Sequence, residues 1–266
     1  MSTAPRAPAI GSEAPRPPTL WMMLPAFNEA ENLSGLLTDF AATLKAWGPG
    51  APPFRVVVVD DGSQDDTAAV AERPYGMDVT VVRHGVNQGL GAAMKTGIEH
   101  VLARAAPQDV MGSMDADATH PPELLPGMWA KSMAGADLVI ASRYQPGAEI
   151  HGLLWYRRWI SSAASWVLRL MFPGARDYTC GYRLYRVALL DWGRRRYGPH
   201  FLNQRGFSVM VDLLLKLRRQ ARRIEELPLI LRYDRKRGVS KMKLVETTTT
   251  TLRLLGRRFV GDPRGP

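Results

Sequence analysis

Hydrophobic and polar positions form alternating blocks from residue 20 onward, and these blocks predict strands and helices in turn. Short apolar runs, typical of buried strands, occupy residues 20–24, 56–59, 79–82, 110–114 and 138–141. The intervening stretches have helical periodicity at about residues 29–47, 65–72, 89–104 and 122–134. This order indicates an α/β fold with a mostly parallel sheet, whose ligands should gather where the strands end.

Polar segments follow three of the predicted strands. They are residues 25–29, 60–63 and 115–117. Each has a structural interpretation of its own, since Asn28 suits a helix cap and residues 60–62 suit a turn. Three such segments at one edge of a parallel sheet favour a ligand site.

Asp115 and Asp117 are the most informative pair in the chain. They stand one residue apart after an apolar run, so both carboxylates should leave the end of one strand. Such oxygens suit Mg²⁺ or Mn²⁺ and leave coordination positions open for phosphate oxygens. The pair therefore predicts a divalent metal beside the diphosphate of an activated nucleotide.

The charge balance points to phosphates on a partner or substrate. Lys and Arg number 35 against 25 Asp and Glu, a formal charge of +10, with the basic residues concentrated after Arg143. Nucleic acid, an anionic lipid surface and a phosphorylated substrate all fit this excess. The single cysteine, Cys180, excludes an internal disulfide framework and is expected to be a buried apolar residue.

The organisation expected along the chain is one catalytic domain with two flanking segments. Residues 1–19 are rich in proline and predict a disordered leader, residues 20–240 the domain, and residues 241–266 an amphipathic helix and tail. No run reaches the roughly 18 to 20 apolar residues that span a bilayer. We therefore expect a cytosolic protein or one bound peripherally at the cytoplasmic face of a membrane.

Several segments together resemble the glycosyltransferase family 2 enzymes, and within them the dolichyl-phosphate mannosyltransferase (polyprenyl-phosphate glycosyltransferase) group. The resemblance runs from about residue 20 to 258, and its carriers are residues 24–33, 58–67, 87–93, 114–117, 120–123 and 142–144. It implies the nucleotide-diphospho-sugar transferase (glycosyltransferase-A) fold, a mostly parallel mixed sheet flanked by helices, with amphipathic interfacial helices.

The resemblance also implies a donor site. Asp115 and Asp117 would hold the metal, and Thr119 stands at the place of a third ligand, where archaeal relatives often have glutamine. Residues 87–91 are interpreted as a loop leading into a helix beside the donor, or as a turn whose glycines allow tight packing. The residues implied to bind the donor nucleotide are Pro25, Phe27, Glu29, Val59, Asp61, Asp115, Ala116 and Asp117.

A lipid monophosphate acceptor is already an anion near neutral pH, so it needs cations rather than a general base. Residues 235–241 resemble the family's acceptor-side R-x-x-x-G-x-S-K segment, with one residue fewer between Arg235 and Gly238. The acceptor phosphate is thereby assigned to Arg143, Arg157, Ser161, Arg235 and Lys241, and the catalytic roles to Asp117, Arg143, Arg235 and Lys241.

Two further segments bear on the acceptor side. Arg157 and Ser161 share one face of a predicted helix over residues 154–172, whose opposite tryptophan face suits either core packing or a membrane interface. Residues 177–183 resemble the family's D-x-x-S/T-G-F/Y-R segment. In that segment Gly181 would allow a tight approach below the donor sugar and Arg183 would anchor the loop.

The sequence thus predicts an inverting enzyme that moves a hexose, mannose from GDP-mannose foremost, to a polyprenyl or dolichyl monophosphate. Its expected partners are a nucleotide sugar, the lipid phosphate and a membrane surface, without nucleic acid. Two alternatives stay within the family: UDP-glucose or another nucleotide sugar as donor, or a sugar-hydroxyl acceptor with Asp212 or Asp177 as base. A third is a basic nucleic-acid or membrane-surface binding module without catalysis.

Overall fold

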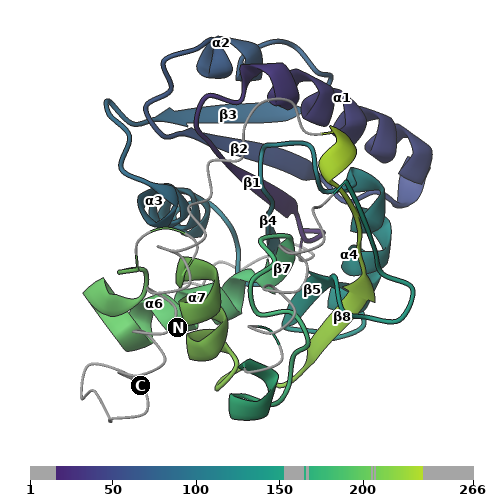
Figure 1. Cartoon of the computed structure of the whole chain (residues 1–266), viewed down its shortest axis with the longest axis vertical. Helices are drawn as coiled ribbons and strands as arrows, with labels where there is room; N and C mark the ends of the chain where they lie inside the picture. The colour runs from purple at the N-terminus through teal and green to yellow at the C-terminus, as the bar shows by residue number, and fades with distance from the viewer. Residues whose placement is uncertain (1–15, 153–164, 166–167, 205, 207, 236–266) are drawn as a thin grey trace, which may run out of the picture.

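The computed structural model describes residues 16–152, 165, 168–204, 206 and 208–235. A seven-stranded sheet forms the centre of this part of the chain, in the order β3-β2-β1-β4-β7-β5-β8 (Figure 1). Its strands are β1 (Leu20–Ala26), β2 (Phe54–Asp60), β3 (Asp78–Arg83), β4 (Val110–Ser113), β5 (Leu138–Ser142), β7 (Arg183–Arg186) and β8 (Ile224–Pro228).

The pairing of the strands brings the predicted polar segments to one edge. Strand β1 pairs in parallel with β2 and β4, β2 with β3, and β5 with β8. Strand β7 runs antiparallel between β4 and β5. The carboxyl ends of β1, β2, β4 and β5 therefore meet at the edge where β7 begins, and the sheet is mixed but mostly parallel, as predicted.

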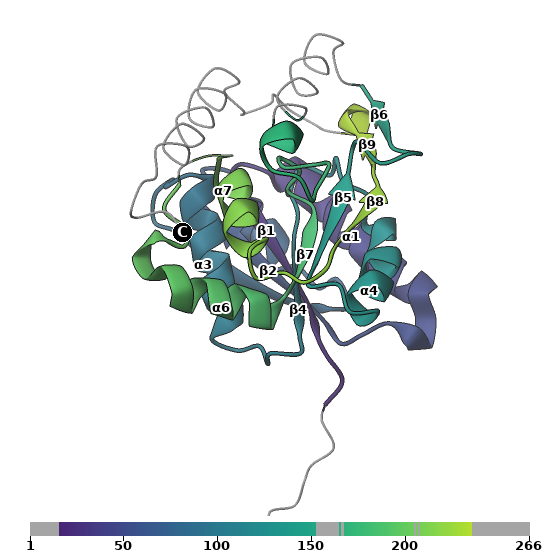
Figure 2. The same cartoon turned by 90° about the horizontal axis from the view of Figure 1, so that it is seen from below.

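Helices cover both faces of the sheet. In Figure 2, α3, α6 and α7 lie along one face, and α1 and α4 along the other. A small second sheet pairs β6 with β9 in parallel. The elements are α1 (Ala30–Trp47), α2 (Thr67–Ala71), α3 (Leu90–Leu102), α4 (Leu125–Met133), α6 (Val187–Tyr197), α7 (Ser208–Leu217), β6 (Glu149–His151), β9 (Ile230–Arg232) and the 3-10 turns η1 (Gly48–Gly50), η2 (Pro122–Leu124), η3 (Gly198–His200) and η4 (Tyr233–Arg235).

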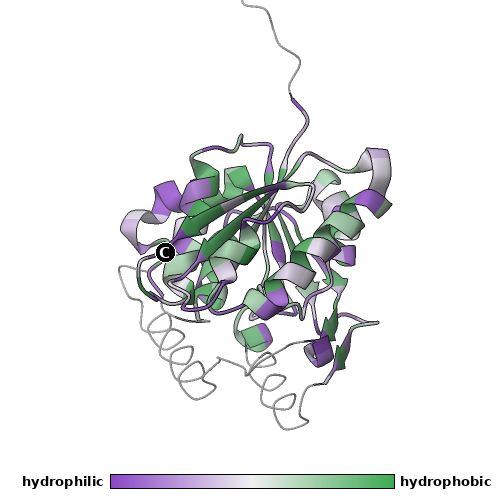
Figure 3. Cartoon of the chain, turned by 90° about the horizontal axis from the view of Figure 1, so that it is seen from above, coloured by the Kyte–Doolittle hydropathy of each residue, from purple (hydrophilic) through white to green (hydrophobic). Residues whose placement is uncertain are grey.

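The core lies between the sheet and these helices. The strands are coloured hydrophobic over most of their length in Figure 3, and the four valines of β2 are fully buried. Helix α3 packs closely on β1 because Gly97 has no side chain: a Cβ there would lie 2.4 Å from Cγ of Met23. Apolar strands buried on both faces explain why the sequence shows continuous runs rather than alternation.

The five predicted strands and four predicted helices are all present, with ends shifted by a few residues. The hydrophobic pattern did not predict β6, β7, β8, β9, α6 or α7. Most of the expected interfacial helix over 154–172, and all of the C-terminal segment 241–266, lie outside the described residues. Of the predicted leader, residues 16–19 are described and contact the fold: Nη2 of Arg16 lies 2.6 Å from Oδ2 of Asp109. No helix in the described ranges combines the length and apolarity needed to cross a bilayer.

Candidate active site

The loops after β1 and β2 are joined into one unit. The backbone N–H of Asn28 donates to Oγ of Ser63 at 2.9 Å, and the N–H of Gln64 donates to Oδ1 of Asn28 at 2.7 Å. Asn28 therefore binds the neighbouring loop and does not cap α1, and its backbone has a φ of 52°. Asn28 and Ala118 are the non-glycine residues with positive φ in the described chain, and both lie in loops at the strand ends.

Asp61 binds a third loop to this unit. Its buried carboxylate accepts the N–H of Gln88 at 3.0 Å and that of Gly89 at 2.7 Å, and it lies 2.6 Å from Nδ1 of His84. Gly89 is the residue before α3, so the predicted loop leading into this helix is present. The carboxylate of Asp61 thus holds residues 88–89 in place at the edge of the sheet.

The other residues assigned to the donor lie along the same edge. Pro25 and Phe27 are partly exposed, whereas Val59 and Ala116 are buried. Cγ2 of Val59 lies 3.2 Å from the position that a Cβ of Gly97 in α3 would take. Oε2 of Glu29 accepts a hydrogen bond from Nδ2 of Asn32 at 2.8 Å. Their contacts with the base and ribose stay a prediction.

The acidic pair after β4 gathers with a histidine. Ligand atoms of Asp115, Asp117 and His120 all lie within 4.8 Å of one another, with the two aspartates partly exposed and the histidine buried. Two carboxylates and one imidazole nitrogen are a donor set that fits a divalent ion. His120 belongs to the 120–123 segment of the family resemblance. Sequence reasoning missed it as a ligand, because its distance to the aspartates depends on the turn at Ala118.

Thr119, expected as a third metal ligand, forms two hydrogen bonds with Asp117, and its contact with a metal stays a prediction. Its Oγ1 donates to Oδ1 of Asp117 at 2.7 Å, and its backbone N–H reaches the same oxygen at 3.2 Å. The hydroxyl thereby orients the carboxylate. The carbonyl of Thr119 accepts the N–H of Arg232 at 2.9 Å, which brings the chain leading to Arg235 beside the acidic loop.

Gly181 lies directly against the acidic pair. A Cβ at this position would be 3.1 Å from Oδ1 of Asp115. The carbonyl of Gly181 accepts a hydrogen bond from Oγ of Ser113 at 2.8 Å, which fixes the loop before β7 to the end of β4. The absence of a side chain at Gly181 therefore lets the loop lie close to the carboxylate of Asp115.

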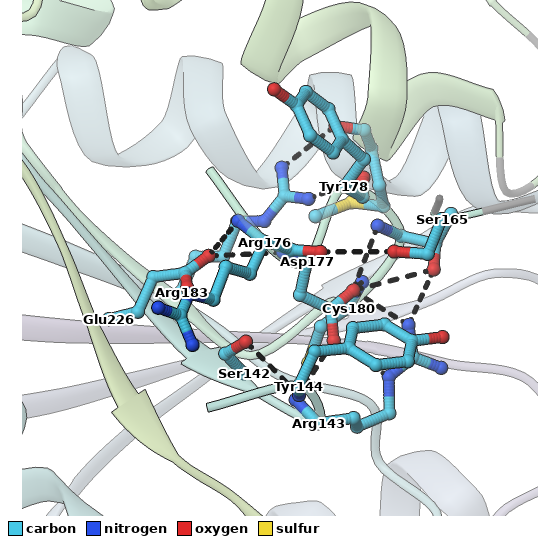
Figure 4. A network of polar contacts seen from close by, with 12 residues as sticks. Ser142, Arg143, Tyr144, Ser165, Arg176, Asp177, Tyr178, Cys180, Arg183 and Glu226 are labelled. Atoms are coloured by element: carbon cyan, nitrogen blue, oxygen red, sulfur yellow. Dashed lines mark hydrogen bonds and ion pairs between the residues drawn. The ribbon is translucent and has the colours of Figure 1, made fainter. Parts of the chain in front are cut away.

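Arg143, expected to contact the acceptor phosphate, forms a buried ion pair with Asp177 (Figure 4). Nε of Arg143 lies 2.8 Å from Oδ2 of Asp177, and Nη2 lies 2.7 Å from Oδ1 of the same carboxylate. Nη2 also donates to Oγ1 of Thr179. Burial opposes the charge of Asp177, but Arg143 and the backbone N–H donors outweigh it and lower the pKa of Asp177 to about 2. Burial likewise raises the pKa of the Cys180 thiol to about 12, which fits the inert role expected for it.

Arg183 anchors this loop, as expected, from a fully buried position in β7. Nη2 donates to the carbonyl of Tyr178 at 2.7 Å and Nη1 to the carbonyl of Met210 in α7 at 2.8 Å. Asp212, two residues further along α7, forms a buried ion pair with Lys216 at 2.5 Å. The guanidinium of Arg183 therefore ties the loop to α7.

Of the remaining residues assigned to the acceptor phosphate, Arg235 is among the residues that the structure describes. Nη1 of Arg235 lies 3.9 Å from Oδ2 of Asp39, and both side chains are nearly half exposed, so this contact holds the arginine weakly. Arg157, Ser161 and Lys241 lie outside the described residues. The assignment of all these residues to the acceptor phosphate stays a prediction.

Comparison with known proteins gives the family. The family model of glycosyl transferase family 2 matches residues 22–192. Polyprenol monophosphomannose synthase of Mycolicibacterium smegmatis is 33% identical over 225 residues, which cover 83% of this chain and 80% of the relative. Undecaprenyl-phosphate mannosyltransferase of Micrococcus luteus is 34% identical over 223 residues, covering 83% and 86%.

A third relative, dolichol-phosphate mannosyltransferase of Pyrococcus furiosus, is 31% identical over 84% of this chain and 58% of its own length. Among solved structures, glucosyl-3-phosphoglycerate synthase of Mycobacterium tuberculosis superposes with a TM-score of 0.60 at 18% identity, covering 93% of this chain and 80% of the other. This likeness confirms the predicted nucleotide-diphospho-sugar transferase fold. With the family model matching more than half of its length, the chain belongs to glycosyl transferase family 2 and is a glycosyltransferase.

Proposed function

We propose that this enzyme transfers mannose from GDP-mannose to a polyprenyl monophosphate, with inversion at the anomeric carbon. Support for the sugar and the acceptor comes from the names of the relatives, which are polyprenol monophosphomannose synthase, undecaprenyl-phosphate mannosyltransferase and dolichol-phosphate mannosyltransferase. Support for GDP as the nucleotide comes from the sequence resemblance.

The observation that favours a phosphate acceptor is the state of the acids on the acceptor side. A sugar-hydroxyl acceptor needs a base, and the two candidates were Asp177 and Asp212. Both are buried in ion pairs, Asp177 with Arg143 and Asp212 with Lys216. With a pKa of about 2, Asp177 has little affinity for a proton at neutral pH. A lipid monophosphate, whose second pKa is about 6, needs no base.

The donor diphosphate would bind at the edge where β1, β2 and β4 end. Asp115 and Asp117, with His120, would hold a divalent ion there, Mg²⁺ or Mn²⁺. When bound, that ion neutralises negative charge on the leaving diphosphate. Thr119 keeps Asp117 oriented, and the loop carrying Asp61 shapes the nucleotide side.

The acceptor side would be cationic. In our proposal Arg143, Arg235 and the undescribed Arg157, Ser161 and Lys241 orient one phosphate oxygen of the lipid behind the anomeric carbon. A bond forms between that oxygen and the anomeric carbon while the bond from this carbon to the diphosphate breaks, so the leaving group departs as GDP. Orientation and electrostatic stabilisation carry the rate, because no proton has to be removed.

Because the acceptor's hydrocarbon chain resides in a bilayer, the enzyme would act at a membrane surface. We propose peripheral binding at the cytoplasmic face, supported by the net charge of +10, which favours anionic headgroups. Flotation with vesicles containing or lacking anionic lipid tests this directly, and binding equal in both would refute the electrostatic part of it.

The decisive experiment measures transfer of labelled sugar to a polyprenyl phosphate, with GDP-mannose and UDP-glucose as competing donors and with Mg²⁺, Mn²⁺ or a chelator. The variants are Asp117→Asn and, as a matched control, Asp78→Asn. Asp78 begins β3 at the opposite edge of the sheet and its side chain is 55% exposed. We expect metal-dependent mannosyl transfer that Asp117→Asn abolishes and Asp78→Asn leaves intact.

Other outcomes separate the alternatives. Transfer from UDP-glucose alone would correct the donor and keep the acceptor. Transfer to a sugar hydroxyl with no lipid-linked product would refute the acceptor, and activity unchanged by chelation and by Asp117→Asn would refute the metal site.

A further inference from the structure

We propose that Arg169 is an additional residue that binds the phosphate group of the lipid acceptor. It lies in the predicted helix over residues 154–172, but the sequence analysis assigned it no role. The inference rests on the proposed function, because it assigns one more residue to the acceptor of that reaction.

The charge of the neighbouring Arg143 is already compensated. The carboxylate of Asp177 accepts hydrogen bonds from Nε of Arg143 at 2.8 Å and from its Nη2 at 2.7 Å. It also accepts one from the backbone N–H of Arg143 at 3.1 Å. Guanidinium and carboxylate form a pair with no net charge. An incoming phosphate therefore gains less from Arg143 alone than the sequence suggested.

Arg169 adds a second guanidinium at the same place. Its Cζ lies 4.6 Å from the ring centroid of Tyr144, and Cζ of Arg143 lies 5.5 Å from that centroid. The two arginines thus share one aromatic ring. Across the described part of the chain, Arg169 has no carboxylate within ion-pair distance, so its positive charge is the uncompensated one of the two.

One donor of Arg169 lacks an acceptor among the residues that the structure describes. Nη2 is shielded from solvent and has no hydrogen-bond partner within the described ranges. Buried donors nearly always find an acceptor, because leaving one unsatisfied is costly. Phosphate oxygen suits a guanidinium particularly well, since it is anionic and fits the planar array of N–H groups.

The guanidinium is held in place before any ligand arrives. Its Nε donates a hydrogen bond to the carbonyl of Arg176 at 2.8 Å. The same carbonyl accepts a hydrogen bond from Oγ of Ser165 at 3.0 Å. The N–H of the same Arg176 donates to Oε1 of Glu226 in β8 at 2.6 Å (Figure 4). A binding group fixed in this way loses little conformational entropy when it binds.

The position is connected to the donor side by a short loop. This loop starts at Asp177, beside the two arginines, and reaches Gly181, which lies against Asp115. A phosphate held by Arg169 would therefore sit at the far end of the loop from the acidic cluster. That is the relation required between an acceptor phosphate and a donor diphosphate, which must stay apart while the sugar passes between them.

The test measures binding of a short-chain isoprenyl monophosphate by calorimetry, with inorganic phosphate and the corresponding isoprenyl alcohol as further probes. The proteins are the full chain, Arg169→Gln, Arg169→Met and a control, Arg73→Gln. Arg73 is an exposed arginine between α2 and β3, at the opposite edge of the sheet. Methionine keeps an apolar stem over the Tyr144 ring, so one neutral variant remains informative if the other fails to fold.

We expect either Arg169 variant to bind the isoprenyl phosphate roughly 10- to 100-fold more weakly, as removal of a charged hydrogen bond predicts. Binding of the alcohol, the KM for the nucleotide sugar and all properties of Arg73→Gln should not change. Weaker binding of inorganic phosphate by the same factor would show that the headgroup alone is recognised. An unchanged inorganic phosphate affinity would show that the lipid chain positions it.

Two results would overturn the inference. One is a folded Arg169 variant with undiminished affinity for the isoprenyl phosphate, whatever its thermal stability, because a purely structural arginine affects only the latter. The other is an equal loss in Arg73→Gln, which would indicate a general charge effect. Failure of the unmodified chain to bind the isoprenyl phosphate would instead refute the proposed function itself.

Discussion

Arg143 and Asp177 form a two-point ion pair in which Asp177 is fully buried and the arginine side chain is 15% exposed. Such a pair contributes little net stability when both partners are present, because removing each from water is costly. Loss of one partner has a larger effect, since the other stays buried and charged. This asymmetry leads to the first prediction.

Asp177→Asn should lower the free energy of unfolding by about 3 to 5 kcal/mol at pH 7. The native pKa of Asp177, about 2, is below its ordinary value of 3.8, so its contribution is complete above about pH 4 and is lost as the pH falls toward 2. The difference between the variant and the unmodified chain should therefore shrink over that interval. Urea unfolding at several pH values measures it, and Asp78→Asn, at an exposed pair, should have almost no effect. A difference that does not vary with pH would contradict the low pKa.

Gly62 and Gly76 offer a matched comparison, because both have a φ of 73°. A Cβ at Gly62 would lie 2.4 Å from the carbonyl carbon of Val86, whereas nothing lies within 4 Å of one at Gly76. Gly76→Ala should lower the free energy of unfolding by about 1 to 2 kcal/mol, the cost of holding alanine in a left-handed backbone conformation. Gly62→Ala should cost a further 1 to 3 kcal/mol, roughly, since the backbone of the 86–89 loop must shift. Equal destabilisation in urea titrations would show that this approach is not tight.

Gly181→Ala should weaken binding of the metal with little loss of stability. The added methyl group would lie 3.1 Å from Oδ1 of Asp115, so the carboxylate must move by a few tenths of an ångström. We expect about a tenfold loss of Mn²⁺ affinity, measured by paramagnetic resonance of the unbound ion. Gly35→Ala, in α1 with open space around its Cβ, is the control and should bind Mn²⁺ normally. Normal binding by both variants would mean that Asp115 adapts freely.

Thr119→Val should weaken Mn²⁺ binding by about 10-fold, because the hydroxyl that orients Asp117 is lost while the shape is kept. Thr119→Ser should restore most of the affinity. Thr38→Val removes a hydroxyl that donates to the carbonyl of Ser34 on the exposed side of α1, and it should bind Mn²⁺ as the unmodified chain does. If Thr119→Ser binds as weakly as Thr119→Val, the hydrogen bond to Asp117 is not the cause.

Much of the fold could be predicted because the first half of the chain encodes it locally. Each parallel strand there is a continuous apolar run, and each crossover helix has its own periodicity. Strand β7 lacks such a run: it is four residues long, with an arginine at each end. Arg183 is fully buried there because the preceding loop and α7 offer it carbonyl acceptors. The acceptor in α7, Met210, is 27 residues away, so no local pattern reveals that partner.

The same distinction applies to the site. The acidic pair was predictable because its spacing and position after a strand are local features. The ion pair of Arg143 with Asp177, the contact of Thr119 with Asp117 and the arrangement around Arg169 could not be foreseen. They depend on side-chain geometry, and in two of the three cases on segments brought together only by the tertiary fold.

The central position of β7 has a consequence for the order of folding. Strands β1 to β4 find their parallel partners within the first half of the chain, but both partners of β5 in the sheet, β7 and β8, follow it by at least forty residues. Pairing between such distant segments is slow, because a long loop must close first. During synthesis the first half can condense early, while β5 must wait for β7. The edge of the sheet that carries the candidate active site, where strands of both halves end, should thus be among the last features to form in the nascent chain.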